Sequence, residues 1–394
     1  METVELLEIL SRGEDSKHQF KRNVTNVDSL AGEMVAFSNG AGGTMFIGVN
    51  DDGSISGLTN KDIPRLNQLI SNTASQHIEP AINPLTENIK TDSGLIMLVS
   101  IPAGINKPYM NKNGTIWMKN GADKRRATAR EEIQRLFQQS NLLHADVLPV
   151  PDVTLTDLDL DYFRDFFQRR FGRDLDDEEL SLLTVLENMN LLKDGSLTIA
   201  GVLLFSKYPG FKLPAFIVKA GAFDSFDLNT TNYNDSRDIA GKLSDVFQQT
   251  VYFIVSNLRH VQGDQGINSV GIPEIPRESI EELVSNALIH RDYFISAPVR
   301  VFIFRDRVEI ISPGHLPNNL TVENIKAGNS NARNPTLASF ANHVLPYRGY
   351  GSGIIRALAK YPGIDFFDDR EGNLFKVTLK RGTRSSLLPC NRRV

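Results

Sequence analysis

The sequence holds one cysteine among 394 residues, and none of its apolar runs reaches the length that crosses a bilayer. A single cysteine, Cys390, excludes a disulfide framework and a thiolate zinc site, and it fits a reducing compartment. The first residues are acidic and lack the basic-then-apolar pattern of a signal peptide, so the expected location is the cytoplasm, with no membrane partner. Basic residues are not in excess either, because the formal net charge is −4. Any nucleic-acid surface must therefore be local rather than a coat over the whole chain.

The length implies two or three domains. Acidic charge concentrates in the middle, where residues 150–260 carry 17 acidic and 11 basic side chains; residues 261–394 carry 13 acidic and 17 basic ones. Helical and strand-like patterns alternate, which predicts a multidomain α/β (α+β) protein. The predicted parts are an N-terminal α/β domain over 1–145, a middle helical and mixed segment over 146–262, a C-terminal α/β sandwich over 263–382, and a basic flexible tail over 383–394.

The C-terminal part contains two neighbouring motifs that suit a phosphate ligand. Apolar residues recur at helical spacing over residues 278–293, and on that helix Glu282 and Asn286 stand four apart and share a face. A carboxamide oxygen can ligate a divalent ion, and a carboxylate beside it can polarise a water. About sixty residues later, Gly349, Gly351 and Gly353 open a helical run, and backbone N–H groups at such a start can hold phosphate.

This order of motifs resembles the GHKL (gyrase, histidine kinase and MutL) ATPase fold, with strands expected at 300–304, 308–311 and 373–379. The resemblance implies that Glu282 is the catalytic residue if the chain is an ATPase, and that Asn286 holds Mg²⁺ if a nucleotide binds. The family carries an aspartate for the adenine amino group where this chain has Ser312, a weaker acceptor because it is neutral. We therefore predict weak or absent binding of ATP with Mg²⁺. The implied nucleotide-binding residues are Asn286, Ser312, Gly314, Arg333, Gly349, Gly351 and Gly353.

The N-terminal part resembles the Schlafen AlbA-type domain through Phe20-Lys21, Ala36–Asn39, Gly42-Gly43, Ile47–Val49 and Asp52–Gly57. Together with residues 311–317 and 330–335, this resembles a group of bacterial and archaeal transcriptional regulators, sometimes called RecG-like, that join such a domain to a divergent GHKL domain. No Gly-Lys-Ser/Thr follows Gly43, so the chain is not a P-loop motor helicase.

Some relatives of the Schlafen type cleave RNA with two glutamates five apart and a later aspartate. This chain keeps Glu14 but has Gln19 at the second position, with Asp51 or Asp52 as the later carboxylate. Loss of one carboxylate weakens a divalent site, because hard cations prefer charged oxygen ligands. Binding of nucleic acid without cleavage is the prediction.

Two basic groups in this part are candidate phosphate contacts, and Trp117 beside the second group is placed to stack on a base. The alternative is that residues 116–118 form a buried strand and that the basic residues form a solvated face, partly neutralised by Glu131 and Glu132. The candidate nucleic-acid-binding residues are Lys17, Lys21, Arg22, Lys119, Lys124, Arg125 and Arg126.

The middle segment predicts helices over 156–170 and 174–190, then an apolar hairpin over 197–205, a strand over 215–220 and a helical region over 242–261. Two helices and a hairpin suggest a winged helix, but the acidic charge argues against DNA docking. A coupling or oligomerisation role is the interpretation, and a homo-oligomer is expected.

Three functions follow from these patterns. The first is a DNA-binding transcriptional regulator with a degenerate GHKL-like nucleotide domain used for sensing or assembly. The second is an active Mg²⁺-dependent ATPase, and the third is a metal-dependent ribonuclease. We rank the regulator first because Ser312 weakens the ATPase reading and Gln19 weakens the ribonuclease reading.

Overall fold

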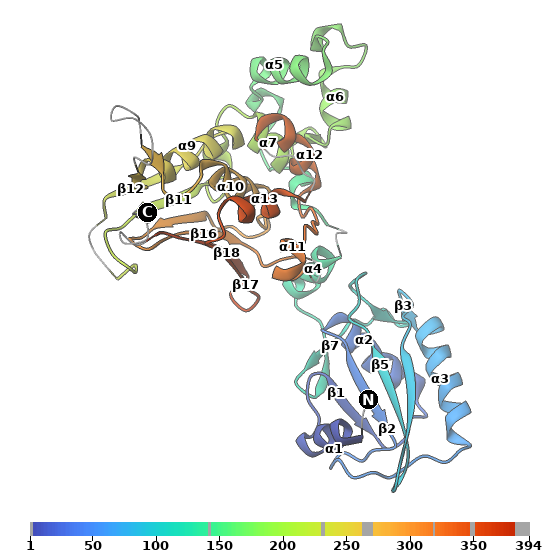
Figure 1. Cartoon of the computed structure of the whole chain (residues 1–394). Coiled ribbons are helices and arrows are strands. Elements are labelled where there is room, and N and C mark those ends of the chain that lie inside the picture. Colours follow the sequence, from blue (N-terminus) through green and yellow to red (C-terminus); the bar gives the residue numbers. More distant parts are fainter. Residues whose placement is uncertain are drawn as a thin grey trace, which may run out of the picture. The chain divides into compact units, whose positions relative to one another are not determined.

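The computed structural model describes residues 3–140, 143–229, 233–261, 271–317, 320–346 and 351–382. The chain forms two compact units, Met1–Leu143 and His144–Val394 (Figure 1). Each unit has its own sheet and its own hydrophobic core, so the protein is a mixed α/β multidomain chain as predicted. The predicted tail beyond residue 382 lies outside the described residues.

The first unit is built on a four-stranded sheet in the order β1-β2-β5-β4. Its strands are β1 (His18–Lys21), β2 (Gly43–Ile47), β4 (Leu85–Thr91) and β5 (Gly94–Ile101). β1 runs parallel to β2, and the other neighbouring pairs are antiparallel. Parallel neighbours need a long crossover connection, and α2 (Val27–Asn39) supplies it. The remaining elements are α1 (Thr3–Arg12), α3 (Asp62–Gln76), β3 (Ile78–Glu79), β6 (Met110–Asn111), β7 (Trp117–Asn120), β8 (Asp123–Arg126) and α4 (Arg130–Gln139).

Both faces of this sheet are covered. Successive side chains in a strand point to opposite faces, and Met45 and Ile47 of β2 join the core with α2 and α3, whereas Phe46 joins Leu6 and Leu10 of α1. This explains why β2 reads as a continuous apolar run rather than an alternating one. β7 and β8 form a separate hairpin against α2.

The second unit is built on a six-stranded mixed sheet in the order β12-β11-β15-β16-β18-β17. These strands are β11 (Val218–Ala222), β12 (Asp235–Ile239), β15 (Val299–Ile303), β16 (Arg307–Pro313), β17 (Ile364–Asp369) and β18 (Leu374–Lys380). β11 pairs in parallel with β15, and the other pairs are antiparallel. In β15, Val299, Val301 and Ile303 are buried while Arg300 is exposed, which marks the face that the helices cover.

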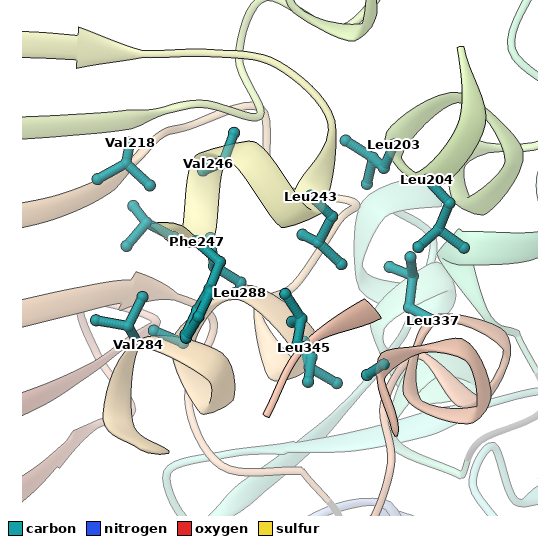
Figure 2. Packing of buried hydrophobic residues seen from close by; sticks show 14 of the residues in the cluster. Leu203, Leu204, Val218, Leu243, Val246, Phe247, Val284, Leu288, Leu337 and Leu345 are labelled. Carbon is teal, nitrogen blue, oxygen red and sulfur yellow. The ribbon is translucent and has the colours of Figure 1, made fainter. Parts of the chain in front are cut away.

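α10 (Arg277–His290) lies in the core of the second unit and contacts α9 (Leu243–Ser256), α13 (Gly353–Lys360) and β16. Figure 2 shows this core at Phe247 of α9, which lies on the side of Val284 and Leu288 of α10. Each such side chain contributes about 1.5–3 kcal/mol when it is fully buried. The remaining elements are η1 (Ala145–Val147), η2 (Leu155–Asp157), α5 (Leu160–Phe171), η3 (Leu175–Asp177), α6 (Leu182–Asn188), β9 (Leu192–Lys193), β10 (Ser196–Leu197), α7 (Ile199–Phe205), α8 (Pro209–Lys212), β13 (His260–Val261), β14 (Ile272–Pro273), α11 (Val322–Lys326) and α12 (Pro335–Val344).

The segment predicted as a separate middle part, 146–262, shares one core with the C-terminal part. β11 and β12 belong to the same sheet as β15, and α7 packs its Leu203 and Leu204 near Leu337 of α12 (Figure 2). The structure therefore has one unit from His144 onward where the sequence suggested a boundary near residue 262.

Two local predictions in this segment differ from the structure. The run predicted as an apolar hairpin, 197–205, contains only the last residue of the short strand β10, whose partner β9 precedes the run. Its residues Ile199–Phe205 form the helix α7, which Thr198 caps by accepting from Gly201 N–H at 3.1 Å. Residues 200–205 are all buried, and a helix buried on every side has the same unbroken apolar pattern as a buried strand. The helix predicted over 174–190 starts only at Leu182, where Ser181 caps it. Within the described residues, no helix is long and apolar enough to span a bilayer.

Candidate functional site

An open pocket lies between α10, the sheet and the start of α13; its empty space, counted together with the solvent at its mouth, is about 990 Å³. Its apolar floor comes from the sheet through Ile310, Phe366, Phe375 and Val377. Phe366 and Phe375 stack with ring centroids 6.1 Å apart. An apolar floor of this kind accepts a flat apolar group of a ligand, and the polar residues around it can fix the orientation of that ligand. The polar residues on the lining are Glu282, Asn286, His290, Ser312, His315, Asn329, Ser330, Asn331, Ser352 and Arg356.

Glu282 is held at one end of the pocket by two neighbours. Its Oε2 pairs with the guanidinium of Arg356 at 2.9 Å, and its Oε1 accepts from Asn286 Nδ2 at 3.2 Å. The Glu282 side chain is only 10% exposed, and that of Arg356 is 41% exposed. Arg356 also donates to Ser352 Oγ at 2.6 Å. The first turn of α13 is thus tied to the second turn of α10 through a charged pair.

Close packing explains the glycine at the start of α13. A Cβ atom placed on Gly353 would collide with the carboxylate of Glu282. Gly351 has a φ of +70°, in the left-handed region, and a Cβ there would collide with the carbonyl oxygen of Gly328. Gly351 therefore requires glycine, and Gly353 accepts a side chain only if the Glu282 carboxylate moves.

Ser312 is the last residue but one of β16, lies beside α10 and is 6% exposed. Its hydroxyl donates to the carbonyl oxygen of Ala287 at 3.1 Å, in the last turn of α10, where helical carbonyls lack an intrahelical donor. The hydroxyl proton of Ser312 is therefore engaged by Ala287 O, and the hydroxyl oxygen can serve a ligand only as a neutral hydrogen-bond acceptor. Gly314 follows with a φ of +96°, and its N–H donates to Asn373 O at 2.8 Å.

Arg333 lies behind this loop rather than on the pocket lining. Its guanidinium donates to His315 O at 2.7 Å and lies 3.7 Å from the carboxylate of Asp292. It therefore supports the backbone after Gly314. His290 lines the pocket, and burial, with a smaller effect of Arg333, lowers the pKa of His290 to about 4. The imidazole is neutral at neutral pH.

In the first unit, Lys119 of β7 is buried among oxygen atoms. Its ammonium donates to Gln19 Oε1 at 2.7 Å and to the carbonyl oxygen of Ala122, and it lies 3.9 Å from Glu33 Oε2. The side chain is 6% exposed, and burial lowers the pKa of Lys119 although Glu33 and Glu14 oppose the shift. The Gln19 amide in turn donates to Glu14 at 2.8 Å.

This arrangement does not fit a divalent ion at Glu14. The carboxylate of Glu14 already accepts from the Gln19 side chain and from Phe20 N–H, and the neighbouring cationic position is taken by the ammonium of Lys119. Across the described ranges, no group of three or more His, Cys, Asp or Glu side chains could hold a metal ion.

The candidate phosphate contacts divide into paired and unpaired cations. Lys124 pairs with Glu33 at 2.7 Å, and Arg125 forms a two-pronged pair with Glu132. Arg126 lies over the Trp117 ring at 5.4 Å and is exposed. Within the part of the chain that the structure describes, the four candidates without a carboxylate partner are Lys17, Lys21, Arg22 and Arg126.

Two family models match the chain. The model "Schlafen, AlbA_2" matches residues 14–128, and the model "Putative ATP-dependent DNA helicase recG C-terminal" matches residues 296–379. The chain joins a Schlafen AlbA_2 domain to a RecG-related C-terminal domain. The predicted pairing of these two domain types is confirmed.

The solved structures that are similar to the chain include the following two. The DIP2311 protein from Corynebacterium diphtheriae is 22% identical, with a TM-score of 0.45, and the match covers 93% of this chain and 65% of that one. The N-terminal domain of a "Putative ATP-dependent DNA Helicase RecG-related Protein" from Nitrosomonas europaea is 20% identical, with a TM-score of 0.21, and covers 33% of this chain and 97% of that one. This chain therefore spans about two thirds of the length of the first of them. No curated protein sequence matches it.

Most of the predicted nucleotide-binding residues meet at the pocket of the second unit, although the RecG-related match itself begins after α10. Glu282 and Asn286 come from α10, Ser312 and Gly314 from the end of β16, and Gly351 and Gly353 from the start of α13. Arg333 stands behind them, and Gly349 lies outside the described residues. The amide nitrogen of Asn286 donates to Glu282, and a carboxamide oxygen on the pocket lining is a suitable ligand for Mg²⁺.

Sequence reasoning missed Arg356 and His290 as pocket residues. Arg356 stands three residues after Gly353 on a helix, so the glycine motif placed it near the site, but nothing in the sequence pointed to its pairing with Glu282. His290 is one turn beyond Asn286, at the same four-residue spacing that relates Asn286 to Glu282. That spacing was a usable signal.

Proposed function

We propose that this chain is a DNA-binding transcriptional regulator whose RecG-related domain holds an adenine nucleotide weakly, for sensing or assembly, with little or no turnover. The observation that carries the proposal is the pocket that collects Glu282, Asn286, Ser312, Gly314 and Gly353 from three elements far apart in sequence. The Schlafen AlbA_2 match supports a nucleic-acid partner, and the words "ATP-dependent" in the C-terminal family's name support the ligand class.

Weak binding follows from the chemistry at the base end of the pocket. The Ser312 oxygen is neutral, so an adenine amino group loses one charge-assisted hydrogen bond, worth about 1.5–3 kcal/mol. That energy corresponds to about one to two decades in affinity. The pairing of Glu282 with Arg356 also opposes a role for Glu282 as a general base, because the carboxylate is already occupied.

The direct test is thermal unfolding with and without ATP and Mg²⁺. A ligand that binds only the folded state stabilises it, by about 2.7 kcal/mol at a concentration one hundred times its Kd. We expect a rise in melting temperature only at high nucleotide concentration, and its loss in Asn286→Ala. A chain that melts identically at all ATP concentrations contradicts the nucleotide part of the proposal.

Replacing Ser312 with aspartate tests the reason for weak binding. Ser312→Asp should raise ATP affinity by about tenfold or more, but not GTP affinity. Adenine carries its amino group on carbon 6, from which the carboxylate would accept, whereas guanine has a carbonyl oxygen there. The variant should also lose stability, by about 1–3 kcal/mol, since it breaks the bond to Ala287 O and buries a charge. Isothermal titration with ATP and with GTP measures the gain in affinity, and urea unfolding measures the loss of stability.

The DNA part is tested by mobility shift with random duplex DNA and single strands across a salt series. Contacts with phosphate make the logarithm of the affinity fall linearly with the logarithm of salt concentration. Absence of DNA binding at low salt contradicts the DNA-binding part of the proposal.

The active ATPase remains the second candidate because Glu282 and Asn286 both line the pocket. Micromolar binding with Glu282-dependent phosphate release would place it first.

A further inference from the structure

The end of the pocket at α13 contains a charged pair rather than an open cationic site. Arg356 is the one arginine or lysine among the described lining residues, and its guanidinium is 2.9 Å from Glu282 Oε2. The carboxylate also lies against Gly353, where a Cβ would collide with it in its present position. A carboxylate held by a guanidinium, a glycine and a carboxamide has the surroundings that a phosphate oxygen would take.

We propose that the Glu282 carboxylate is an internal stand-in for a polyphosphate ligand, and that the ligand binds by displacing it from Arg356. This inference deepens the proposed function, because it names how the same pocket selects its ligand. The ligand must carry an anionic chain long enough to reach Arg356, joined to a flat group that fits the apolar floor at Phe366 and Phe375. In this view Glu282 lowers affinity in the resting protein, and Arg356 is the residue that recognises the anion.

The ion pair is accessible enough to exchange. Arg356 keeps 41% of its side chain exposed, so its guanidinium can turn toward a ligand without crossing a packed core. Its other partner, Ser352, is neutral and at the same end of the pocket. When a phosphate takes the guanidinium, the like charge of Glu282 is repelled from it, and the attraction that held the carboxylate in place is gone.

The same two helices provide a matched control. Glu278 of α10 pairs with Lys360 of α13 at 2.9 Å, but both side chains are exposed and neither lines the pocket. Glu278→Gln therefore removes one carboxylate and one interhelical ion pair without touching the proposed site. It should leave ligand affinity unchanged.

The experiment measures binding of inorganic tripolyphosphate, adenosine and ATP to the full chain by isothermal titration. We expect Glu282→Gln to bind tripolyphosphate and ATP about tenfold more tightly than the unmodified chain, Arg356→Gln to bind them about tenfold more weakly, and the double variant to lose the gain. Glu282→Asp, with a shorter side chain and the same charge, should lie between the unmodified chain and Glu282→Gln. If Glu282→Gln does not fold, the Glu282→Asp and Arg356→Gln results decide.

The outcomes separate this inference from the proposed function. Equal or weaker tripolyphosphate binding in a folded Glu282→Gln, or an equal gain in Glu278→Gln, overturns the stand-in role. ATP binding that ignores both Glu282 and Arg356 also overturns it, while the nucleotide proposal survives. Tripolyphosphate binding that follows the variants as expected, with adenosine adding nothing, supports the stand-in role and overturns the nucleotide proposal.

Discussion

Gly314 has a φ of +96° and lies against Arg333 and Asp292 in the loop that shapes the base end of the pocket. A Cβ there would collide with the Arg333 guanidinium and come within 2.6 Å of Asp292 Cβ. Gly314→Ala should therefore destabilise the second unit by about 2–5 kcal/mol, combining backbone strain with overpacking. Urea unfolding measures this loss.

Gly172 is the matched control for that substitution. It has a φ of +70° at the end of α5, and no atom lies within 4 Å of a Cβ placed there. Gly172→Ala should cost only the backbone term, about 1–2 kcal/mol. Equal losses in the two variants would mean that contact with Arg333 adds nothing at Gly314.

His290 gives the second unit a dependence on pH. Its pKa is about 4 in the folded protein, lowered chiefly by burial, against an ordinary value near 6.5. The unfolded chain therefore takes up the proton first, so stability is full above about pH 6.5 and is lost as the pH falls toward 4. Between pH 7 and pH 5 the loss from this group is about 2 kcal/mol.

Replacing the imidazole tests this. His290→Gln should flatten the decline in unfolding free energy between pH 7 and pH 5, measured by urea unfolding at each pH. A smaller slope should remain, because burial also lowers the pKa of His315. Identical slopes for the variant and the unmodified chain would assign the pH dependence to other groups.

The site was predictable where chemistry follows from local spacing. Glu282 and Asn286 are four apart on a helix, and Gly351 and Gly353 begin another, so sequence alone identified both motifs. The pair between Glu282 and Arg356 joins residues 74 positions apart, and no local rule links them. Ser312 was predicted as a weak acceptor, but its bond to Ala287 O depends on how β16 docks against α10.

At the scale of elements, the hairpin β7–β8 carries two kinds of basic side chain: Lys119 is buried and supports the fold, whereas Arg126 is exposed and is a candidate DNA contact. Lys119→Ala should lower the stability of the first unit by about 1–3 kcal/mol, because the Gln19 oxygen and Glu33 lose a buried donor while Lys124 still pairs with Glu33. DNA affinity should keep its salt slope. Thermal unfolding and the salt series are the measurements.

Arg126→Ala is the complementary variant from the same hairpin. It loses only a contact with the Trp117 ring, so stability should change by less than about 1 kcal/mol. The salt slope should fall by about one unit if Arg126 touches a phosphate. An unchanged slope would leave Arg126 as part of a solvated face.

Elements were predicted best where one face is buried and the other exposed. β15 has that character, and α10 carries a buried apolar stripe at helical spacing; both were predicted with the right type. α7 is buried all round, so its apolar run carried no period, and its cap at Thr198 was the one local sign of a helix.

At the scale of the whole molecule, the sequence favoured two resemblances and left residues 146–262 as a connector. It could not tell that β11 pairs with β15, because strand partners 81 positions apart are chosen by the packing of the complete unit. The acidic side chains of this segment did not indicate that its apolar residues share a core with the C-terminal part. A homo-oligomer stays a prediction.

A sensing role requires coupling between two ligands in different units. The candidate DNA contacts all lie in the first unit and the pocket lies in the second, so no candidate side chain is shared. If nucleotide changes DNA affinity, the effect must be reciprocal: the factor by which nucleotide alters DNA affinity equals the factor by which DNA alters nucleotide affinity. Typical coupling is about 1–3 kcal/mol, or 5- to 150-fold.

We expect such a factor when DNA is titrated without nucleotide and with saturating ATP and Mg²⁺, and the same factor when nucleotide is titrated without and with saturating DNA. Asn286→Ala should bind DNA alone normally and lose the effect of nucleotide. Unequal factors would indicate turnover during the measurement, since reciprocity holds only for binding equilibria. If both ligands bind and neither changes the affinity for the other, the protein does not sense nucleotide through this pocket. Because a ligand can shift an equilibrium only through different affinities for its two states, the pocket would then serve assembly.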